Sequence, residues 1–306
     1  MPALQSASLG IWVVAGGRNE RPEQNGIAHF LEHMAFNGSE SIPEGEMVKR
    51  LERFGLSFGA DTNAYTSFDE TVYMLDLPEV SDEILNETLF IMRETADHLL
   101  LDQGAIDRER GVVQSEKRRG DSPGSRASLA QLEFLTRGSR ISDRLPIGSD
   151  ETLATIGSDD FKTYYQGHYR PENAFIVLVG DIEPGHASQK IEEYFGDWAA
   201  TGLALPDQNA GITPPRTGDV GYFSDPEVQT QITMATIRPF NDTQDTAENR
   251  KVNFIKSMGN RILNRRLDSL ARKSDAVFIG AGASESYSLD TAEIMTLTMS
   301  SQPENW

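Results

Sequence analysis

The sequence contains no cysteine among its 306 residues. Disulfide bonds and thiolate metal sites are therefore excluded, and any zinc ion would have to take nitrogen and oxygen ligands. The absence chooses no compartment, because a reducing cytosol and an oxidising periplasm both tolerate such a chain. The sequence also lacks any run of 18 or more apolar residues, so we expect no membrane-spanning segment.

Basic residues are the second scarce class. Lys and Arg number 28 against 47 Asp and Glu, which gives a formal net charge of −19. Proteins that bind duplexes usually show a basic face, and the one basic cluster here, Lys117-Arg118-Arg119, is short. We therefore expect no nucleic-acid partner. The acidic excess indicates either a solvated surface or a negative cavity that favours basic or neutral peptides.

The N-terminal residues Met1–Ser6 lack the basic-then-apolar layout of a secretory signal. Hydrophobic spacing then predicts alternating strands and helices. The predicted strands are Ala7–Val14, Ser57–Thr66, Glu70–Leu77 and Ala174–Val179. The predicted helices are 26–37, a second opening at Ile42–Glu46, Ser81–Leu101, Gln103–Arg119, Arg126–Leu135, Ser158–Tyr165 and Pro184–Phe195. Ala174–Val179 is a continuous apolar run, which predicts a buried strand, and Ser122-Pro123-Gly124 is expected to break the helical pattern.

The order of elements repeats after a stretch rich in Pro, Gly and Ala, which we take as a linker at 201–217. In the second half, Phe278-Ile279-Gly280-Ala281 parallels Ser57-Phe58-Gly59-Ala60. The predicted fold is α+β, with duplicated domains that each pack helices on one side of an antiparallel sheet. We expect a first domain at 1–200 and an incomplete second copy at 218–306.

The segment His29-Phe30-Leu31-Glu32-His33 carries the residue types of a zinc hydrolase. His29 and His33 are four apart on a predicted helix, so their rings project from one face and can share one ion. Glu32 points to nearly the same side, where it can take a proton from metal-bound water and deliver it to the leaving amine. The spacing is the inverted form of the His-Glu-x-x-His motif. Such short patterns also occur by chance, but these polar groups within an apolar helix are hard to explain as packing.

A catalytic zinc site needs a third protein ligand and leaves the fourth position to water. His98, His168 and His186 are isolated in the sequence. Glu109 and Glu116 are seven residues apart and so face one side of the same predicted helix. One of them can bind the metal while the other supports a histidine or the bound water. The spacing does not rank the two, and most glutamate pairs of this kind are solvated.

These motifs together resemble the pitrilysin/insulinase family of zinc peptidases, and most of all its bacterial PqqL-type branch. The resemblance covers essentially the whole chain. It is carried by the segments Gly26–Leu77, Arg108–Glu116, Leu145–Gly148 and Tyr169–Asp181.

The resemblance implies a fold like that of mitochondrial processing peptidase and a role for each matching residue. It implies one Zn²⁺ ion held by three ligands, with a base, a supporting carboxylate and a substrate-pairing edge strand. The roles fall to His29, His33 and Glu116 as ligands, Glu32 as base, Glu109 as the carboxylate that supports the ligands, and Asn63 and Ala64 on the edge strand. A turn residue is the alternative interpretation of Asn63.

The resemblance further implies a zinc endopeptidase that cleaves peptides or unfolded segments within a clamshell. Its other half would lie in the same longer chain or in a partner subunit, because the usual first strand and the end of the second domain are not found here. The alternatives are a non-catalytic subunit or scaffold, an inactive fragment, or zinc hydrolysis of another substrate. The branch favours the bacterial periplasm, and a cytoplasmic location stays open.

Overall fold

The computed structural model describes residues 6–206 and 209–305, so most of the N-terminal stretch inspected for a signal and part of the predicted linker lie outside the described residues. The chain divides into two compact units. The first comprises Met1–Arg118 and Asp143–Asn209, and the second comprises Arg119–Ser142 and Ala210–Trp306. Residues 119–142 thus group with the second unit, whereas the domain boundaries predicted at residues 200 and 218 stay a prediction.

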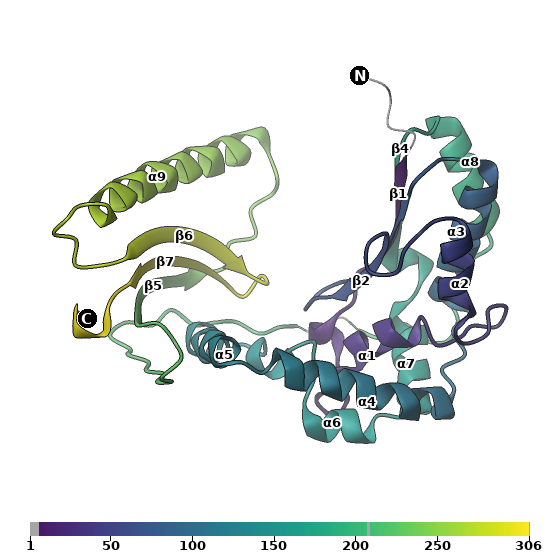
Figure 1. Ribbon diagram of the computed structural model, residues 1–306, viewed down its shortest axis with the longest axis horizontal. Helices are drawn as coiled ribbons and strands as arrows, with labels where there is room; N and C mark the ends of the chain where they lie inside the picture. Colours follow the sequence, from purple (N-terminus) through teal and green to yellow (C-terminus); the bar gives the residue numbers. More distant parts are fainter. Residues whose placement is uncertain (1–5, 207–208, 306) are drawn as a thin grey trace. The chain divides into compact units, whose positions relative to one another are not determined.

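The first unit is built on a four-stranded antiparallel sheet (Figure 1). Its strands are β1 (Ala7–Val13), β2 (Thr62–Thr66), β3 (Thr71–Leu77) and β4 (Ala174–Gly180), in the order β2-β3-β1-β4. Burial alternates along β1, because successive side chains of a strand point to opposite faces. All four strands lie within the ranges expected from the sequence or one residue beyond them, although β2 begins later because residues 59–61 form a turn.

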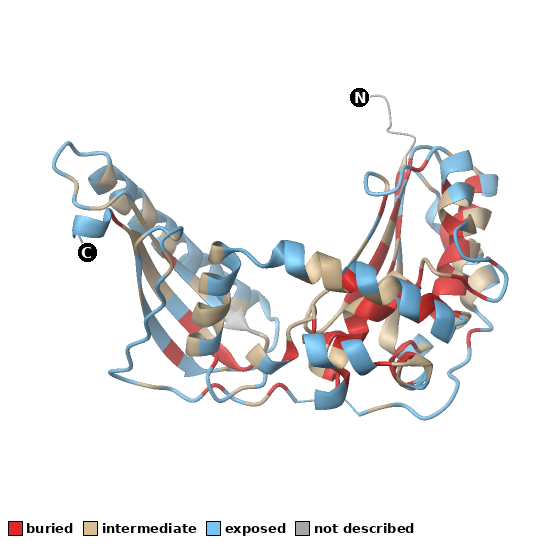
Figure 2. Ribbon diagram, turned by 60° about the horizontal axis from the view of Figure 1, so that its bottom comes forward, coloured by how far each residue is buried: buried red, intermediate tan, exposed pale blue. Residues whose placement is uncertain are grey.

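Helices α1 (Ile27–Met34) and α3 (Asp82–Asp97) pack on one face of this sheet (Figure 1). The other helices of the unit are α2 (Glu46–Arg53), α4 (Gln103–Gly120), α6 (Asp150–Thr155), α7 (Ser158–His168) and α8 (Pro184–Phe195), with short 3₁₀ turns at Gly17–Asn19, Pro22–Gln24, Ser142–Arg144 and Pro171–Asn173. Leu9, Ile11 and Val13 of β1 belong to the buried cluster that these helices share with the sheet. Figure 2 shows this core as the concentration of buried residues in the unit.

The prediction of a buried β4 is wrong. β4 lies at an edge of the sheet, and only alternate residues turn toward the core. Phe175 is 61% and Val179 65% exposed, because no described residue covers the outer face at these positions. A continuous apolar run is typical of a strand buried on both faces, but it does not require one.

The second unit contains a three-stranded antiparallel sheet and two principal helices. The elements are β5 (Gln231–Pro239), β6 (Gly280–Ser288), β7 (Ala292–Ser300), α5 (Pro123–Leu135) and α9 (Ala247–Ala271), with a final 3₁₀ turn at Pro303–Asn305. Lys256 of α9 pairs with Glu285, whereas Leu135 of α5 packs against Ile237 and Ile294. Because Ile294 lies opposite Ser286 in the register, Glu285 points to the other face, and the sheet receives one helix on each face.

Both sheets arrange their first strands in the same order. The third strand along the chain lies between the first and the second, as β1-β3-β2 in one unit and as β5-β7-β6 in the other. The α+β fold with antiparallel sheets and packed helices is therefore confirmed, and the shared order agrees with duplicated domains.

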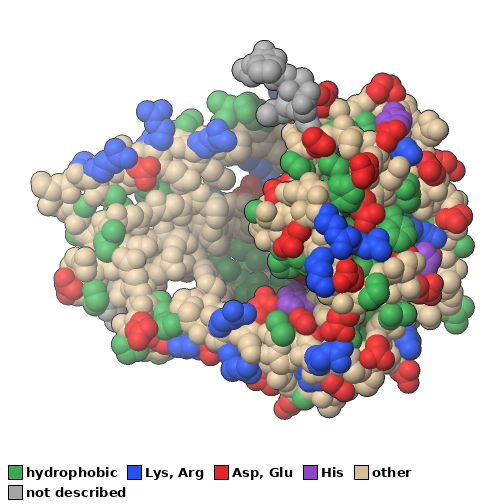
Figure 3. Space-filling view, turned by 45° about the vertical axis from the view of Figure 1, so that its right-hand side comes forward, with side chains coloured by type: hydrophobic (Ala, Val, Ile, Leu, Met, Phe, Trp, Pro, Cys, Tyr) green, Lys and Arg blue, Asp and Glu red, His purple; other side chains and the backbone are tan. Residues whose placement is uncertain are grey.

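The acidic side chains do not form a separate patch on the face that Figure 3 shows. On the face shown in Figure 3, acidic side chains are interspersed with basic ones. None of the described helices combines the length and the apolarity needed to cross a membrane.

Candidate metal centre

Helix α1 presents the motif that the sequence singles out. His29 and His33 lie one turn apart, with ring centroids 4.8 Å from each other. Ile27, Phe30 and Leu31 are fully buried, so the opposite side of the helix is anchored in the core. Apolar residues at helical spacing thus fix the orientation in which the imidazoles are presented.

A buried carboxylate begins this helix. Glu20 accepts hydrogen bonds from the backbone N–H groups of Gly26 at 2.8 Å and Ala28 at 2.9 Å. These are N–H groups that a helix start leaves without intrahelical partners. Burial raises the pKa of Glu20 to about 8, although the two backbone bonds and the charge of Arg144 oppose the shift. Glu20 could not be identified from the sequence, because it precedes α1 by several residues and matches no capping pattern.

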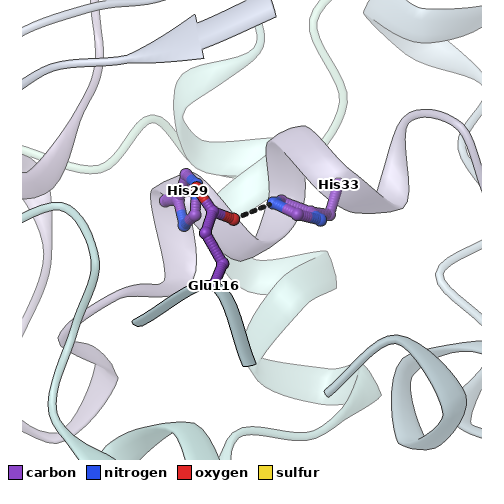
Figure 4. Close-up of side chains that lie close together, drawn as sticks. All are labelled: His29, His33 and Glu116. Atoms are coloured by element: carbon purple, nitrogen blue, oxygen red, sulfur yellow. Dashed lines mark hydrogen bonds and ion pairs between the residues drawn. The ribbon is translucent and has the colours of Figure 1, made fainter. Parts of the chain in front are cut away.

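Glu116 of α4 meets both histidines (Figure 4). Its Oε2 lies 3.1 Å from His33 Nε2, and its Oε1 lies 3.6 Å from His29 Nε2. One ligand atom from each residue can be chosen so that all three lie within 4.8 Å of one another. Among the described residues, this is the group of His, Asp and Glu side chains that could hold a metal ion.

The structure separates the two glutamates that spacing could not rank. Glu109 Oε1 lies 2.9 Å from Nδ1 of His33, the ring nitrogen opposite the one that faces Glu116. The hydrogen bond to His33 lowers the pKa of Glu109, against the effect of burial. Glu109 is therefore a charged acceptor that holds the His33 ring with its Nε2 turned toward Glu116.

The neutral ring of His29 suits a cation beside it. Burial, helped by the neighbouring His33, lowers the pKa of His29 to about 4, so this ring is neutral at pH 7 and has a lone pair to donate. Burial also acts to lower the pKa of His33, but the hydrogen bond that His33 donates to Glu109 and the charge of Glu116 outweigh it and raise the pKa, so a bound cation has to displace a proton from this ring. Nδ1 of His29 is buried without a hydrogen-bond partner among the described residues. Two imidazoles and a carboxylate are a donor set that zinc accepts.

Glu32 stands beside this group without joining it. Glu32 is only 9% exposed. Burial raises the pKa of its carboxyl group, whereas the hydrogen bond from Thr66 and the charge of His33 act to lower it. Thr66 Oγ1 on β2 donates a hydrogen bond of 2.5 Å to Glu32 Oε2. The sequence analysis missed this contact, because it joins residues 34 positions apart and no local pattern signals it.

Asn63 and Ala64 lie on β2, which is the edge of the sheet opposite β4. Asn63 is exposed, and its side-chain amide donates to the carbonyl of Gly59 at 3.4 Å. This contact is compatible with both interpretations of Asn63, the turn residue and the residue of a binding strand.

The three remaining histidines lie apart from the cluster. His186 pairs with Asp82 at 2.7 Å, and His98 lies 3.4 Å from Glu94. His168 is buried with its ring 4.6 Å from that of Tyr164. None of them takes part in the group formed by His29, His33 and Glu116.

Two protein-family profiles match this chain. The profile described as Insulinase (Peptidase family M16) matches residues 2–132, and the profile described as Peptidase M16 inactive domain matches residues 155–306. The chain belongs to the insulinase family, peptidase family M16. The metal motif falls within the first matched segment, and the predicted second copy falls within the other.

The relatives support the PqqL-type branch. The chain is 36% identical over 186 residues to the probable zinc protease PqqL of Escherichia coli, which covers 61% of this chain and 20% of that protein. It is 32% identical over 264 residues to the protein of the same name from Haemophilus influenzae, covering 85% of this chain and 28% of that protein. The crystal structure of the first half of the periplasmic protease PqqL from Escherichia coli superposes with a TM-score of 0.85 at 26% identity, covering 98% of this chain and 64% of that one. The chain thus spans less than a third of these curated relatives.

Proposed function

We propose that this chain is the zinc-binding part of an M16 endopeptidase that hydrolyses peptides or unfolded protein segments. The observation that carries the proposal is the convergence of His29, His33 and Glu116 from two helices within 4.8 Å. These three residues would hold one zinc ion, and Glu109 would hold the His33 ring in place from its far nitrogen. The zinc-protease names of its relatives support the same reaction class.

Glu32 is the proposed general base. When zinc is bound, it lowers the pKa of a water molecule and polarises a carbonyl group. Glu32 takes a proton from the attacking water and passes it to the leaving nitrogen. Burial raises the pKa of its carboxyl, which brings the group closer to the working range of a base that must also act as an acid.

The edge strand β2 is the proposed binding surface for the substrate backbone. A peptide that adds to an open sheet edge gains main-chain hydrogen bonds, so its sequence matters little. Asn63 and Ala64 lie on this edge strand, opposite Met74 and Tyr73 of β3. Such pairing requires an extended peptide, which explains why folded proteins are not the proposed substrates.

The rest of the machinery would come from outside this chain. The solved Escherichia coli relative is a first half, which supports a second half that completes the enzyme, in the same longer chain or as a partner subunit. That relative is also called periplasmic, which favours the periplasm for this protein. The rival function is a non-catalytic scaffold of the same fold. The second matching profile, which is described as an inactive domain, supports this alternative.

The experiment measures bound zinc and cleavage of a quenched fluorescent peptide in the full-length protein, for the wild type and for Glu32→Gln. The substitution keeps the shape of the side chain and removes the base. We expect one zinc ion per chain in both proteins and a loss of cleavage by roughly 10²- to 10⁴-fold in the variant, the usual contribution of a general base.

Bound zinc without cleavage that depends on Glu32 would contradict the peptidase function. A protein that binds no zinc would support the scaffold instead. Cleavage of a non-peptide ester, but of no peptide, would keep the metal site and replace the substrate class.

A further inference from the structure

We propose that Thr66 is a positioning residue that holds Glu32 and ties it to the strand on which the peptide would pair. The proposal rests on the proposed peptidase function and names a residue that the metal motif does not contain. Thr66 Oγ1 donates to Glu32 Oε2 at 2.5 Å, so one carboxylate oxygen is fixed from strand β2. The other oxygen, Oε1, is the one that can accept a proton from water.

The backbone of Thr66 faces the open edge of the sheet. The Asp76 N–H bonds to the Asp61 carbonyl, and the Ser67 N–H bonds to the Glu70 carbonyl. Residues of an antiparallel strand alternate between those that exchange hydrogen bonds with the neighbour and those that do not. Counting between Asp61 and Ser67, the even-numbered residues turn their N–H and C=O groups away from β3. Ala64 and Thr66 therefore present these groups to an added strand.

The side chain of Thr66 points out of the plane of the sheet, into the helix layer. Thr62, Ala64 and Thr66 share one face of β2, and it is the face that meets α1. One residue thus offers main-chain groups to a peptide and a hydroxyl to the base. This sharpens the sequence prediction for the edge strand, because Ala64 and Thr66 supply the pairing groups and Asn63 turns its backbone toward β3.

The turn after Thr66 is docked tightly, which makes its hydroxyl a fixed reference. The N–H of Gly17 bonds to the Ser67 carbonyl at 3.0 Å, and the N–H of Arg18 bonds to the Phe68 carbonyl at 2.7 Å. A Cβ atom at Gly16 would lie 2.3 Å from the Ser67 carbonyl oxygen, so only glycine permits this approach. The position of Thr66 is therefore set by backbone contacts between the turn that follows it and the segment that leads into α1.

The test uses Thr66→Val, which replaces the hydroxyl by a methyl group of similar size and leaves the backbone groups in place. Thr66→Ser restores the hydroxyl. Thr62→Val is the matched control, because Thr62 lies on the same face of the same strand and its Oγ1 is buried without a hydrogen-bond partner among the described residues. The full-length proteins are compared for kcat and KM on a quenched peptide and for zinc affinity by chelator competition. Crystal structures of the wild type and Thr66→Val complete the set.

We expect Thr66→Val to lower kcat by roughly 10- to 100-fold, since misplacing a catalytic group by about 1 Å can cost ~10²-fold. KM and zinc affinity should stay unchanged, because the pairing groups and the ligands are intact. Thr66→Ser and Thr62→Val should keep the wild-type kcat. In the crystal structure of Thr66→Val, the Glu32 carboxylate should leave its wild-type position.

A wild-type kcat in Thr66→Val, or a Glu32 carboxylate that stays in place, would overturn the proposal. An equal loss in Thr62→Val would show a general effect of packing on β2 and would also overturn it. If the wild type cleaves no peptide, the proposed function fails, and the two crystal structures alone decide whether Thr66 holds Glu32.

Discussion

The two units share a strand order but differ in what their first long connection carries. Between β1 and β2, helix α1 brings His29 and His33 to face Glu116. Between β5 and β6, helix α9 carries amides instead, and Asn264 bonds to the backbone of Ala283 on the neighbouring strand. The fold alone therefore does not make the candidate metal site, because the same arrangement of strands occurs with and without the proposed ligands.

The units also differ in their cores. The first buries a cluster that extends through its sheet and helices, whereas the buried cluster described in the second consists of Ile237, Ala292 and Ile294. Apolar side chains on α9 remain exposed, with Phe254 at 64% and Ile255 at 58%. The unit that presents the proposed metal ligands is therefore also the one with the larger buried core to hold them in place.

The largest expected effect is on zinc content, which should depend on the first unit and not on the second. His33→Ala removes one of the proposed ligands, and we expect the variant to lose zinc, because two remaining ligands do not make a stable site. Asn260→Ala changes a polar residue on the corresponding helix of the second unit and should keep full zinc content. Elemental analysis of the dialysed proteins measures both. Zinc retained by His33→Ala would break the assignment.

The second prediction compares the cores. Leu9 is only 1% exposed, so Leu9→Ala leaves a cavity in the large cluster. The substitution should lower the free energy of unfolding by roughly 2–5 kcal/mol. Ile294→Ala should cost less, about 2 kcal/mol, because the small cluster around it can relax into the space. Hydrogen exchange of peptides from β1 and β7 resolves the two units. Equal losses would mean that the cores do not differ as described.

The smallest effect per unit of pH or per substitution is expected at the start of α1. The pKa of Glu20 is raised from 4.5 to about 8 in the folded chain, so the folded state binds more protons between these pH values. The free energy of unfolding should therefore fall as pH rises through this window, by at most about 1.4 kcal/mol per pH unit from this group. Glu20→Gln should remove that slope. Parallel curves for the two proteins, from urea denaturation at several pH values, would contradict the role of Glu20.

Local features were well predicted from the sequence. The apolar spacing around His29–His33 predicted α1, and the alternation in Glu70–Leu77 predicted β3. The break expected at Ser122-Pro123-Gly124 does separate α4 from α5. However, α5 begins at Pro123 and not at Arg126, since the Ser122 hydroxyl accepts from the N–H of Ser125 and Pro123 occupies the first helical position. The six-residue helix α6 was missed, because it is too short to show periodicity.

Non-local features could not be predicted from residues alone. The spacing of Glu109 and Glu116 placed both on one helix face, and only the three-dimensional arrangement shows which oxygen meets which imidazole nitrogen. The bond from Thr66 to Glu32 likewise depends on a hairpin folding back onto α1. The exposure of β4 depends on which elements cover the sheet, which the apolar run itself does not report.

We propose that one zinc ion binds between α1 and α4 of the first unit. Anomalous diffraction at the zinc edge, from crystals of the zinc-loaded protein, locates the ion directly. We expect a single peak about 2.0–2.2 Å from Nε2 of His29, Nε2 of His33 and a carboxylate oxygen of Glu116. A zinc peak elsewhere on the chain, or none beside these three residues, would contradict it.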